Sequence, residues 1–223
     1  YSLIAVGLGQ FFGISLTQNF LSPYTALNIR EFWSRWHRTL SLWFRDYIYF
    51  PMGGGRGRSW GINILVVFVI SGIWHGAGWN FILWGLFHGC MLVLYKLVGS
   101  RFRIHPFFQW FSTMFFVTIS WLFFYEVNVD QLIVKLKAII QPTGYNMVNL
   151  YNLKSFFGTN LDCLTALFTI FAITSVIWIE YIGMKKKENP YLIWGNYFSL
   201  SVASLMIYLC TPLNTTTFVY FNF

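Results

Sequence analysis

Long apolar runs separated by short polar turns make up most of the chain. Five such runs occupy residues 61–74, 79–98, 107–125, 161–183 and 198–210. Most of them approach the ~20 residues that an α-helix needs to cross the hydrocarbon core of a bilayer. The pattern therefore predicts an all-α fold, a polytopic bundle of transmembrane helices.

The first two runs are joined by a glycine-rich bend. Residues 76–78 read Gly-Ala-Gly, and His75 stands directly before them. If the two runs form a hairpin, His75 lies near its apex or, if the bend is re-entrant, well inside the bilayer. Burying an unpaired ionisable side chain in hydrocarbon is costly, so a histidine within a membrane span indicates a functional site by default.

Residues 28–50 show a second, two-faced helical pattern that is rich in tryptophan and arginine. Apolar and aromatic positions recur at spacings of three and four residues, at Trp33, Trp36, His37, Leu40, Phe44 and Tyr47. Another side carries Arg35, Arg38, Leu42 and Arg45. Asn28 can cap the first turn, and Pro51 with the glycines after it ends the pattern. We predict one amphipathic helix at the membrane interface, with His37 on its apolar side.

Composition supports a membrane protein. With 57% hydrophobic and only 10% charged residues, the chain has too few polar groups to cover a soluble globule. The net charge of +8 does not indicate a nucleic-acid partner, because the basic residues form short clusters between apolar runs, where they face lipid headgroups. If each run crosses once, twelve of the 15 basic residues share one side, which predicts that this side is cytoplasmic and that the loop at 126–160 lies outside.

His37 and His75 are the candidates for chemistry, because both lie in tryptophan-rich apolar surroundings. Desolvation favours their neutral form, which can take a proton from an attacking hydroxyl as a general base. The alternative is that each ring only packs against aromatic side chains and bonds a backbone group. His88, thirteen residues after His75, favours packing and can face the first arm of the hairpin. No histidine or cysteine spacing suggests a metal site, and no bound cofactor is expected.

Arg45 and Asp46 are the adjacent charges of the amphipathic segment. Neighbouring positions on an α-helix point to different sides, so the two do not form a simple i,i+4 pair, and Asp46 is expected to find a cationic partner near the membrane. An orienting or acid–base role for Asp46 is the alternative. We predict Trp74, Asn80, Arg45 and Asp46 as substrate-binding residues.

Three motifs in the first half of the chain match one known family. Residues 31–47 read EFWSRWHRTLSLWFRDY, residues 51–54 read PMGG and residues 73–81 read IWHGAGWNF. Together they strongly resemble the membrane-bound O-acyltransferase (MBOAT) family, in particular its bacterial alginate O-acetylation branch, which is related to the D-alanyl transferases of teichoic acid. The likeness is specific over about residues 1–89 and looser beyond. Tyr125 and Glu126 stand where the family has arginine and alanine, so no role of that arginine is carried over.

The resemblance implies a helix bundle with a tunnel through the bilayer at His75. It makes His75 the principal catalytic base and His37 the second motif histidine. A cytoplasmic acyl thioester, either acetyl-coenzyme A or an acylated carrier protein, would approach as substrate from one side, and a hydroxyl acceptor from the other. The expected activity is O-acyl transfer, with acetyl as the expected group, to a cell-surface or extracellular polysaccharide.

The resemblance also implies a setting and partners. The expected location is the bacterial cytoplasmic (inner) membrane, in contact with membrane lipid and with a periplasmic acetyltransferase as partner. Residues 1–223 resemble the C-terminal part of a single membrane domain whose N-terminal part is absent. Two further readings stay open: a non-catalytic conduit that hands acyl groups to a separate periplasmic transferase, and a transporter, for which the chain carries no second copy of the segment around His75.

Overall fold

The computed structural model describes residues 2–99 and 104–141, together with positions 171, 173–175, 177–178 and 180–182. The chain divides into two compact units, Tyr1–Leu167 and Phe168–Phe223. In the second unit the described positions are helical. The regular structure of both units, over these described residues, is helical and includes no strand, which confirms the all-α class. The predicted run at 198–210 lies outside the described residues, and that at 161–183 lies within them only in part.

The first unit begins with α1 (Ser2–Phe11) and a 3-10 turn, η1 (Pro23–Thr25). Three short pieces follow: α2 (Ile29–Arg35), α3 (Arg38–Phe44) and the π-helical η2 (Arg45–Tyr49). The prediction of one continuous helix over residues 28–50 is therefore wrong. The chain breaks because Trp36 is extended, with ψ of 126°, and His37 adopts the left-handed conformation, with φ of 44° and ψ of 54°.

The start of α2 is capped as predicted. The Asn28 side chain accepts a hydrogen bond of 2.9 Å from the backbone N–H of Glu31. Glu31 reaches back to the backbone N–H of Leu27 at 2.7 Å, so two amides at this helix end are satisfied by side chains. Behind this cap, Ile29 and Phe32 are buried in a core with Val117 of a later helix. The cap and the core together fix the segment that leads to His37.

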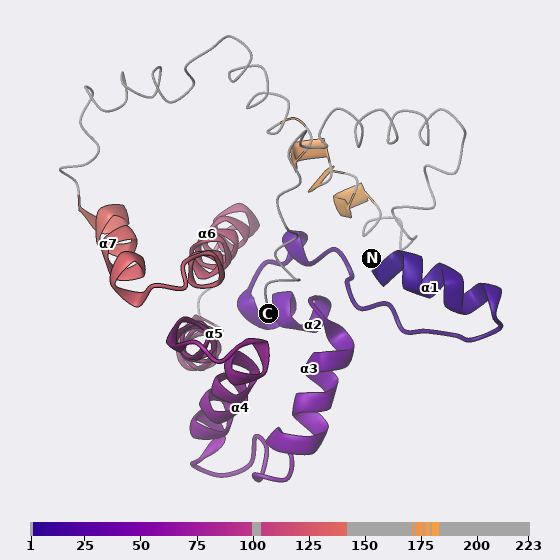
Figure 1. Ribbon diagram of the computed structural model, residues 1–223, viewed down its shortest axis with the longest axis horizontal. Coiled ribbons are helices and arrows are strands. Elements are labelled where there is room, and N and C mark those ends of the chain that lie inside the picture. Colours follow the sequence, from indigo (N-terminus) through magenta and orange to yellow (C-terminus); the bar gives the residue numbers. More distant parts are fainter. Residues whose placement is uncertain are drawn as a thin grey trace. The chain divides into compact units, whose positions relative to one another are not determined.

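Helices α4 (Trp60–His75) and α5 (Trp79–Leu97) form the predicted hairpin and run side by side (Figure 1). Two glycines allow the close approach of their backbones. A Cβ atom at Gly72 would overlap the carbonyl oxygen of Phe81, and one at Gly85 would overlap the carbonyl oxygen of Phe68. Small residues at such positions let membrane helices pack closely. The bend at residues 76–78 therefore joins two arms held in tight contact.

The third apolar run forms helix α6 (Pro106–Tyr125), as predicted, and this helix packs against α5. The next segment differs from the prediction, because part of the expected loop at 126–160 forms helix α7 (Val129–Ile140). Asn128 caps α7 by accepting from the backbone N–H groups of Asp130 and Gln131, and Leu132 is buried. Residues 142–160 lie outside the described part, and the extracytoplasmic location of this segment stays a prediction.

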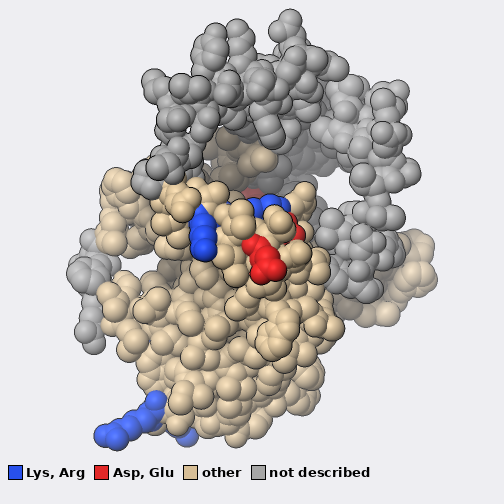
Figure 2. All heavy atoms as spheres, turned by 60° about the vertical axis from the view of Figure 1, so that its left-hand side comes forward, with Lys and Arg blue, Asp and Glu red and all other residues tan. Residues whose placement is uncertain are grey.

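Helices α5 and α6 are long and apolar enough to cross a membrane, whereas α4 has 16 residues and is shorter. Figure 2 shows that charged side chains gather at two places on the visible face, with a broad uncharged stretch of described surface between them. That distribution fits an environment of lipid between two polar borders. A full polytopic bundle, with each run crossing once, stays a prediction.

Candidate active site

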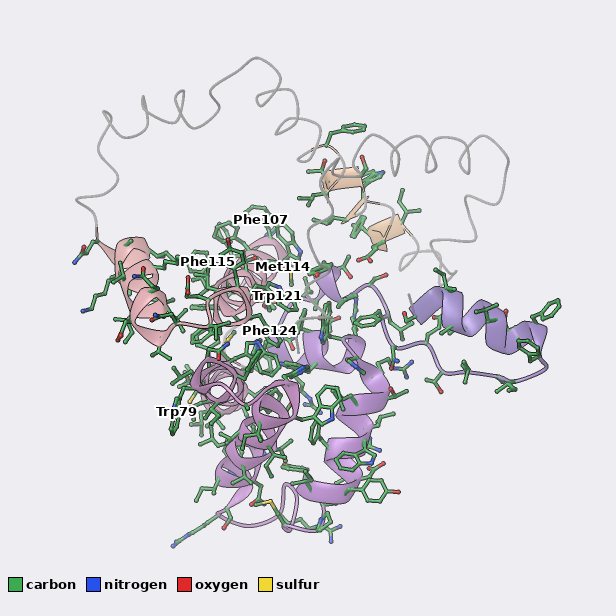
Figure 3. All side chains as sticks on the ribbon, in the orientation of Figure 1. Trp79, Phe107, Met114, Phe115, Trp121 and Phe124 are labelled. Carbon is green, nitrogen blue, oxygen red and sulfur yellow. The ribbon has the colours of Figure 1, made fainter. Side chains whose placement is uncertain are left out.

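His75 is the last residue of α4 and lies in an aromatic cage at the bend of the hairpin. Its ring centroid is 4.8 Å from that of Trp74, 5.0 Å from that of Trp84 and 5.2 Å from that of Phe124, with edge-to-face geometry in each case. Figure 3 shows Phe124 on the side of α6 that faces the hairpin. The His75 side chain is half-buried, so the cage holds the ring while part of it stays open.

His37 stands at the break between α2 and α3. Its ring centroid is 6.0 Å from that of Phe20 and 6.4 Å from that of Trp74. Its Nδ1 atom is buried and finds no hydrogen-bond partner on another described residue. Burial lowers the pKa of His37 from its ordinary value of 6.5, so the neutral imidazole dominates near neutral pH.

The structure thus brings His37, Trp74 and His75 together in one cluster, although 38 positions separate the two histidines in the sequence. The left-handed backbone at His37 is what lets this ring turn toward Trp74 from a chain that would otherwise continue as a helix. Strained conformations of non-glycine residues are concentrated at functional sites. Trp74 itself contacts both imidazoles and is 57% exposed.

Asn80 lies at the start of α5 and ties it to α6. Its side-chain N–H donates a hydrogen bond of 2.7 Å to the backbone carbonyl of Phe123, and the residue is 0% exposed. The Oδ1 atom is buried and has no hydrogen-bond partner among the described residues. The geometry gives Asn80 a structural contact, and its predicted role in substrate binding stays a prediction.

Arg45 and Asp46 pair with each other, which corrects the expectation that they point to different sides of a helix. Arg45 Nε donates to Asp46 Oδ1 at 2.7 Å, and a second Arg45 nitrogen donates to Oδ2 at 3.3 Å. The pair lies in the wider π-helical turn η2, where α-helical angular spacing does not apply, and both side chains are exposed. Asp46 therefore finds its cationic partner next to it, and binding of substrate by this pair stays a prediction.

Arg45 also borders an apolar cavity of about 310 Å³ between the α3–η2 segment and α4. Its walls include Phe44, Phe68 and Ser71, and it reaches Trp33. His75 does not line this cavity, so a continuous tunnel at that histidine stays a prediction. The part of the chain that the structure describes contains no group of three or more His, Cys, Asp or Glu side chains that could hold a metal ion.

Sequence reasoning did not identify Trp84 and Phe124 as walls of the His75 site. No signal in the sequence could have found them, because Trp84 is nine positions after His75 and Phe124 comes from another helix. His88 faces the first arm of the hairpin as expected: its ring stacks on Phe68 of α4 with centroids 6.4 Å apart. The site is therefore formed by packing between helices, which the spacing of residues within one helix does not predict.

Comparison with known proteins agrees with the motifs. The model of the MBOAT, membrane-bound O-acyltransferase family, matches residues 1–128. The whole chain aligns at 32% identity with 46% of "Peptidoglycan O-acetyltransferase" from Helicobacter pylori. With 38% identity, 58% of the chain aligns with 27% of "Probable alginate O-acetylase AlgI" from Azotobacter vinelandii. At 30% identity, 55% of the chain aligns with 34% of "Teichoic acid D-alanyltransferase" from Bacillus subtilis.

The chain spans less than half the length of each of these three relatives. Even so, the family model covers more than half of the chain, including both histidine motifs and the aromatic cage up to Phe124. The predicted resemblance to the alginate O-acetylation type is confirmed by this match and by the alginate O-acetylase relatives. The chain belongs to the membrane-bound O-acyltransferase family.

Proposed function

We propose that the protein containing this chain is a membrane-bound O-acyltransferase that moves an acyl group, with acetyl as the expected one, from a cytoplasmic thioester to a hydroxyl of a cell-surface or extracellular polysaccharide. The observation that carries the proposal is the cluster of His75, Trp74 and His37 at the bend of the apolar hairpin. The names of the relatives add support, since they describe the transfer of acetyl or D-alanyl groups to peptidoglycan, alginate or teichoic acid.

In the proposed reaction the neutral imidazole of His75 takes the proton of the acceptor hydroxyl. The hydroxyl oxygen then attacks the thioester carbonyl carbon, the C–O bond forms, and an oxyanion develops on the carbonyl oxygen. When this intermediate collapses, the C–S bond breaks, and the departing sulfur takes the proton from the His75 imidazolium. Overall, the acyl group moves from the thioester sulfur to the hydroxyl oxygen, and the hydroxyl proton moves to the sulfur. His75 is neutral again at the end of the reaction.

The aromatic cage suits this role for a physical reason. Three rings within about 5 Å of the His75 centroid exclude water and limit the orientations of the imidazole. The half-exposed side of the ring leaves room for a reacting group. In the proposal His37, whose ring also contacts Trp74, assists either as a second base or by holding the acceptor through its buried Nδ1, which finds no hydrogen-bond partner on another described residue.

The proposed setting is the bacterial cytoplasmic membrane, with several crossings. The thioester, acetyl-coenzyme A or an acylated carrier protein, enters from the cytoplasm as a substrate and not as a bound cofactor. A periplasmic acetyltransferase is the proposed partner, and membrane lipid surrounds the helices. Helices α5 and α6, long and apolar enough to span a bilayer, support this arrangement.

The proposal is tested in cells that carry the full-length gene with His75→Ala. Ester-linked acyl groups released from envelope polysaccharide by mild base should fall to the level of a gene deletion, while the protein stays in the membrane fraction. His105→Ala, at an exposed histidine, should leave acylation unchanged. Normal acylation in the His75→Ala strain would overturn the catalytic role and favour a non-catalytic conduit for acyl groups.

A further inference from the structure

His88 is a buried histidine that the proposed reaction does not use. It lies on α5 with 1% of its surface exposed, inside a group of aromatic rings. Its ring centroid is 4.9 Å from that of Trp84 and 5.1 Å from that of Trp33. Apolar residues fill such positions without the cost of desolvating an imidazole, so a specific polar contact is needed to account for histidine here.

That polar contact is made with Trp33. The indole Nε1–H of Trp33 donates a long hydrogen bond of 3.4 Å to Nδ1 of His88. Trp33 lies on α2, four residues before His37, whereas His88 lies on the arm of the hairpin that follows His75. The hydrogen bond therefore connects the segment that carries one motif histidine to the hairpin that carries the other.

Trp84 extends this contact to the reacting ring. Its indole packs edge to face against His88 on one side, at 4.9 Å, and against His75 on another, at 5.0 Å. Trp33 also packs against Trp84, with centroids 5.8 Å apart. His88, Trp33 and Trp84 thus form a three-ring group, and one member of that group is a wall of the His75 cage.

We propose that His88 is a positioning residue for acyl transfer: by accepting the hydrogen bond of Trp33 and backing the Trp84 indole, it fixes the wall against which His75 is oriented. The inference rests on the proposed function of His75. His88 touches neither donor nor acceptor in this arrangement, and it takes no proton in the reaction. Its effect reaches the chemistry through the position of Trp84.

Three variants of the full-length protein separate positioning from packing. His88→Leu removes the acceptor but keeps an apolar side chain of useful size. His88→Asn keeps an acceptor near the place of Nδ1, because the amide oxygen of Asn is the same number of bonds from the backbone. Trp33→Phe keeps an aromatic ring and removes the donor. Trp79→Phe, at a ring that is 73% exposed on the first turn of α5, is the matched tryptophan control (Figure 3).

The measurement is steady-state transfer or hydrolysis of an acetyl thioester by the purified full-length protein, with kcat and KM determined separately. His88→Leu and Trp33→Phe should each lower kcat roughly 10- to 100-fold with little change in the KM for the thioester, since misplaced catalytic groups cost rates of this order. The double variant should be no slower than the slower single variant, because both remove one contact. His88→Asn should recover most of the rate, and Trp79→Phe should match the parent.

Equal kcat for His88→Leu and His88→Asn, or a parental kcat for Trp33→Phe, would overturn the positioning role. If His88→Leu does not fold, Trp33→Phe and His88→Asn still decide the question. The His75→Ala protein is measured in the same assay. If it is as active as the parent, the proposed function itself fails and the inference falls with it; if it is inactive while the His88 variants are normal, only the inference fails.

Discussion

The imidazole of His37 lies edge-on to the indole of Trp74, with ring centroids 6.4 Å apart. This contact joins two segments that the sequence keeps far apart, the broken interfacial segment and the apolar hairpin. It depends on the backbone of His37, which has a positive φ of 44°. A residue other than glycine holds such a conformation at a cost of roughly 1–3 kcal/mol, which has to be offset by the surrounding contacts. Substitutions at this position should therefore affect activity through the lost imidazole and stability through the backbone conformation.

Replacing His37 by glycine and by alanine tests that relation. Both changes remove the imidazole and should lower acyl transfer alike. The glycine variant should have a free energy of unfolding about 1 kcal/mol higher than the alanine variant, because glycine enters the left-handed region without the steric cost of Cβ. Thermal unfolding of the purified protein in detergent gives the comparison. Thr118, an exposed position inside α6, provides the control. There the alanine variant should have the higher free energy of unfolding, because glycine is unfavourable inside a helix. Greater stability of His37→Ala would contradict the role of backbone strain.

The close packing of the α4–α5 hairpin gives a second prediction. Gly72→Ala should destabilise the protein by about 1–3 kcal/mol, because the new methyl group has no space beside the carbonyl of Phe81. Gly61→Ala is the matched control on the same helix, where a Cβ would meet Val93 at an ordinary 3.8 Å. That change should be neutral or slightly stabilising, as alanine favours a helix. Equal melting temperatures for the two variants would show that the arms do not approach as closely as described.

Asn80 gives a third prediction, which separates anchoring from substrate binding. Asn80→Ala removes the hydrogen bond to the Phe123 carbonyl and leaves a buried acceptor without a donor, so it should cost about 1–3 kcal/mol of stability. If the residue only anchors α5 to α6, the KM for the acyl thioester should stay near the parental value at a temperature where the variant is folded. A large rise in KM with unchanged stability would instead assign Asn80 to the substrate.

The pairing of Glu126 with Lys135 predicts a pH effect on the docking of α7. The ammonium of Lys135 donates to the Glu126 carboxylate at 2.5 Å and holds the pKa of Glu126 below its ordinary value of 4.5. A lowered carboxyl pKa stabilises the fold above the ordinary pKa, and that contribution is lost as the pH falls through the lowered value. Glu126→Gln should therefore melt below the parent at pH 7, and the difference should shrink as the pH falls below the ordinary carboxyl value of 4.5 and through the lowered pKa of Glu126.

Salt provides the control for this effect. The Lys135 side chain is 42% exposed, so molar salt should reduce the difference between Glu126→Gln and the parent at pH 7. A difference that persists both in acid and in high salt would show that Glu126 acts through something other than its charge. The pair connects the end of α6 to α7, so the measured change also reports whether α7 stays attached there.

The sequence predicted the helical elements best where one physical signal dominated. The apolar runs gave α4, α5 and α6 nearly to the residue, and the cap at Asn28 is where the sequence places it. Helix α7 was missed, because its polar first turn resembles a loop and its stability depends on the Asn128 cap and on burial of Leu132. The contacts of α7 with other helices could not be predicted from the sequence of that segment alone.

The same limit applies to the site. A periodic pattern across residues 28–50 carried no sign of the break at His37, since a left-handed residue that is not glycine or asparagine leaves no compositional mark. The pairing of Arg45 with Asp46 was also hidden, because it lies in a π-helical turn that the periodic pattern did not predict. His75 and His37 could be nominated from the sequence, whereas the rings that surround them follow from how α2, α5 and α6 pack.

Turnover of an acetyl thioester by the purified full-length protein tests the central claim most directly. The parent protein and His75→Ala are compared in lipid vesicles, with free thiol as the readout and a small hydroxyl compound as acceptor. We predict that the parent releases thiol in an acceptor-dependent manner and that His75→Ala, folded with an unchanged melting temperature, releases it no faster than empty vesicles. Parental turnover by His75→Ala would contradict the claim that the histidine at the bend of this hairpin is the base for acyl transfer.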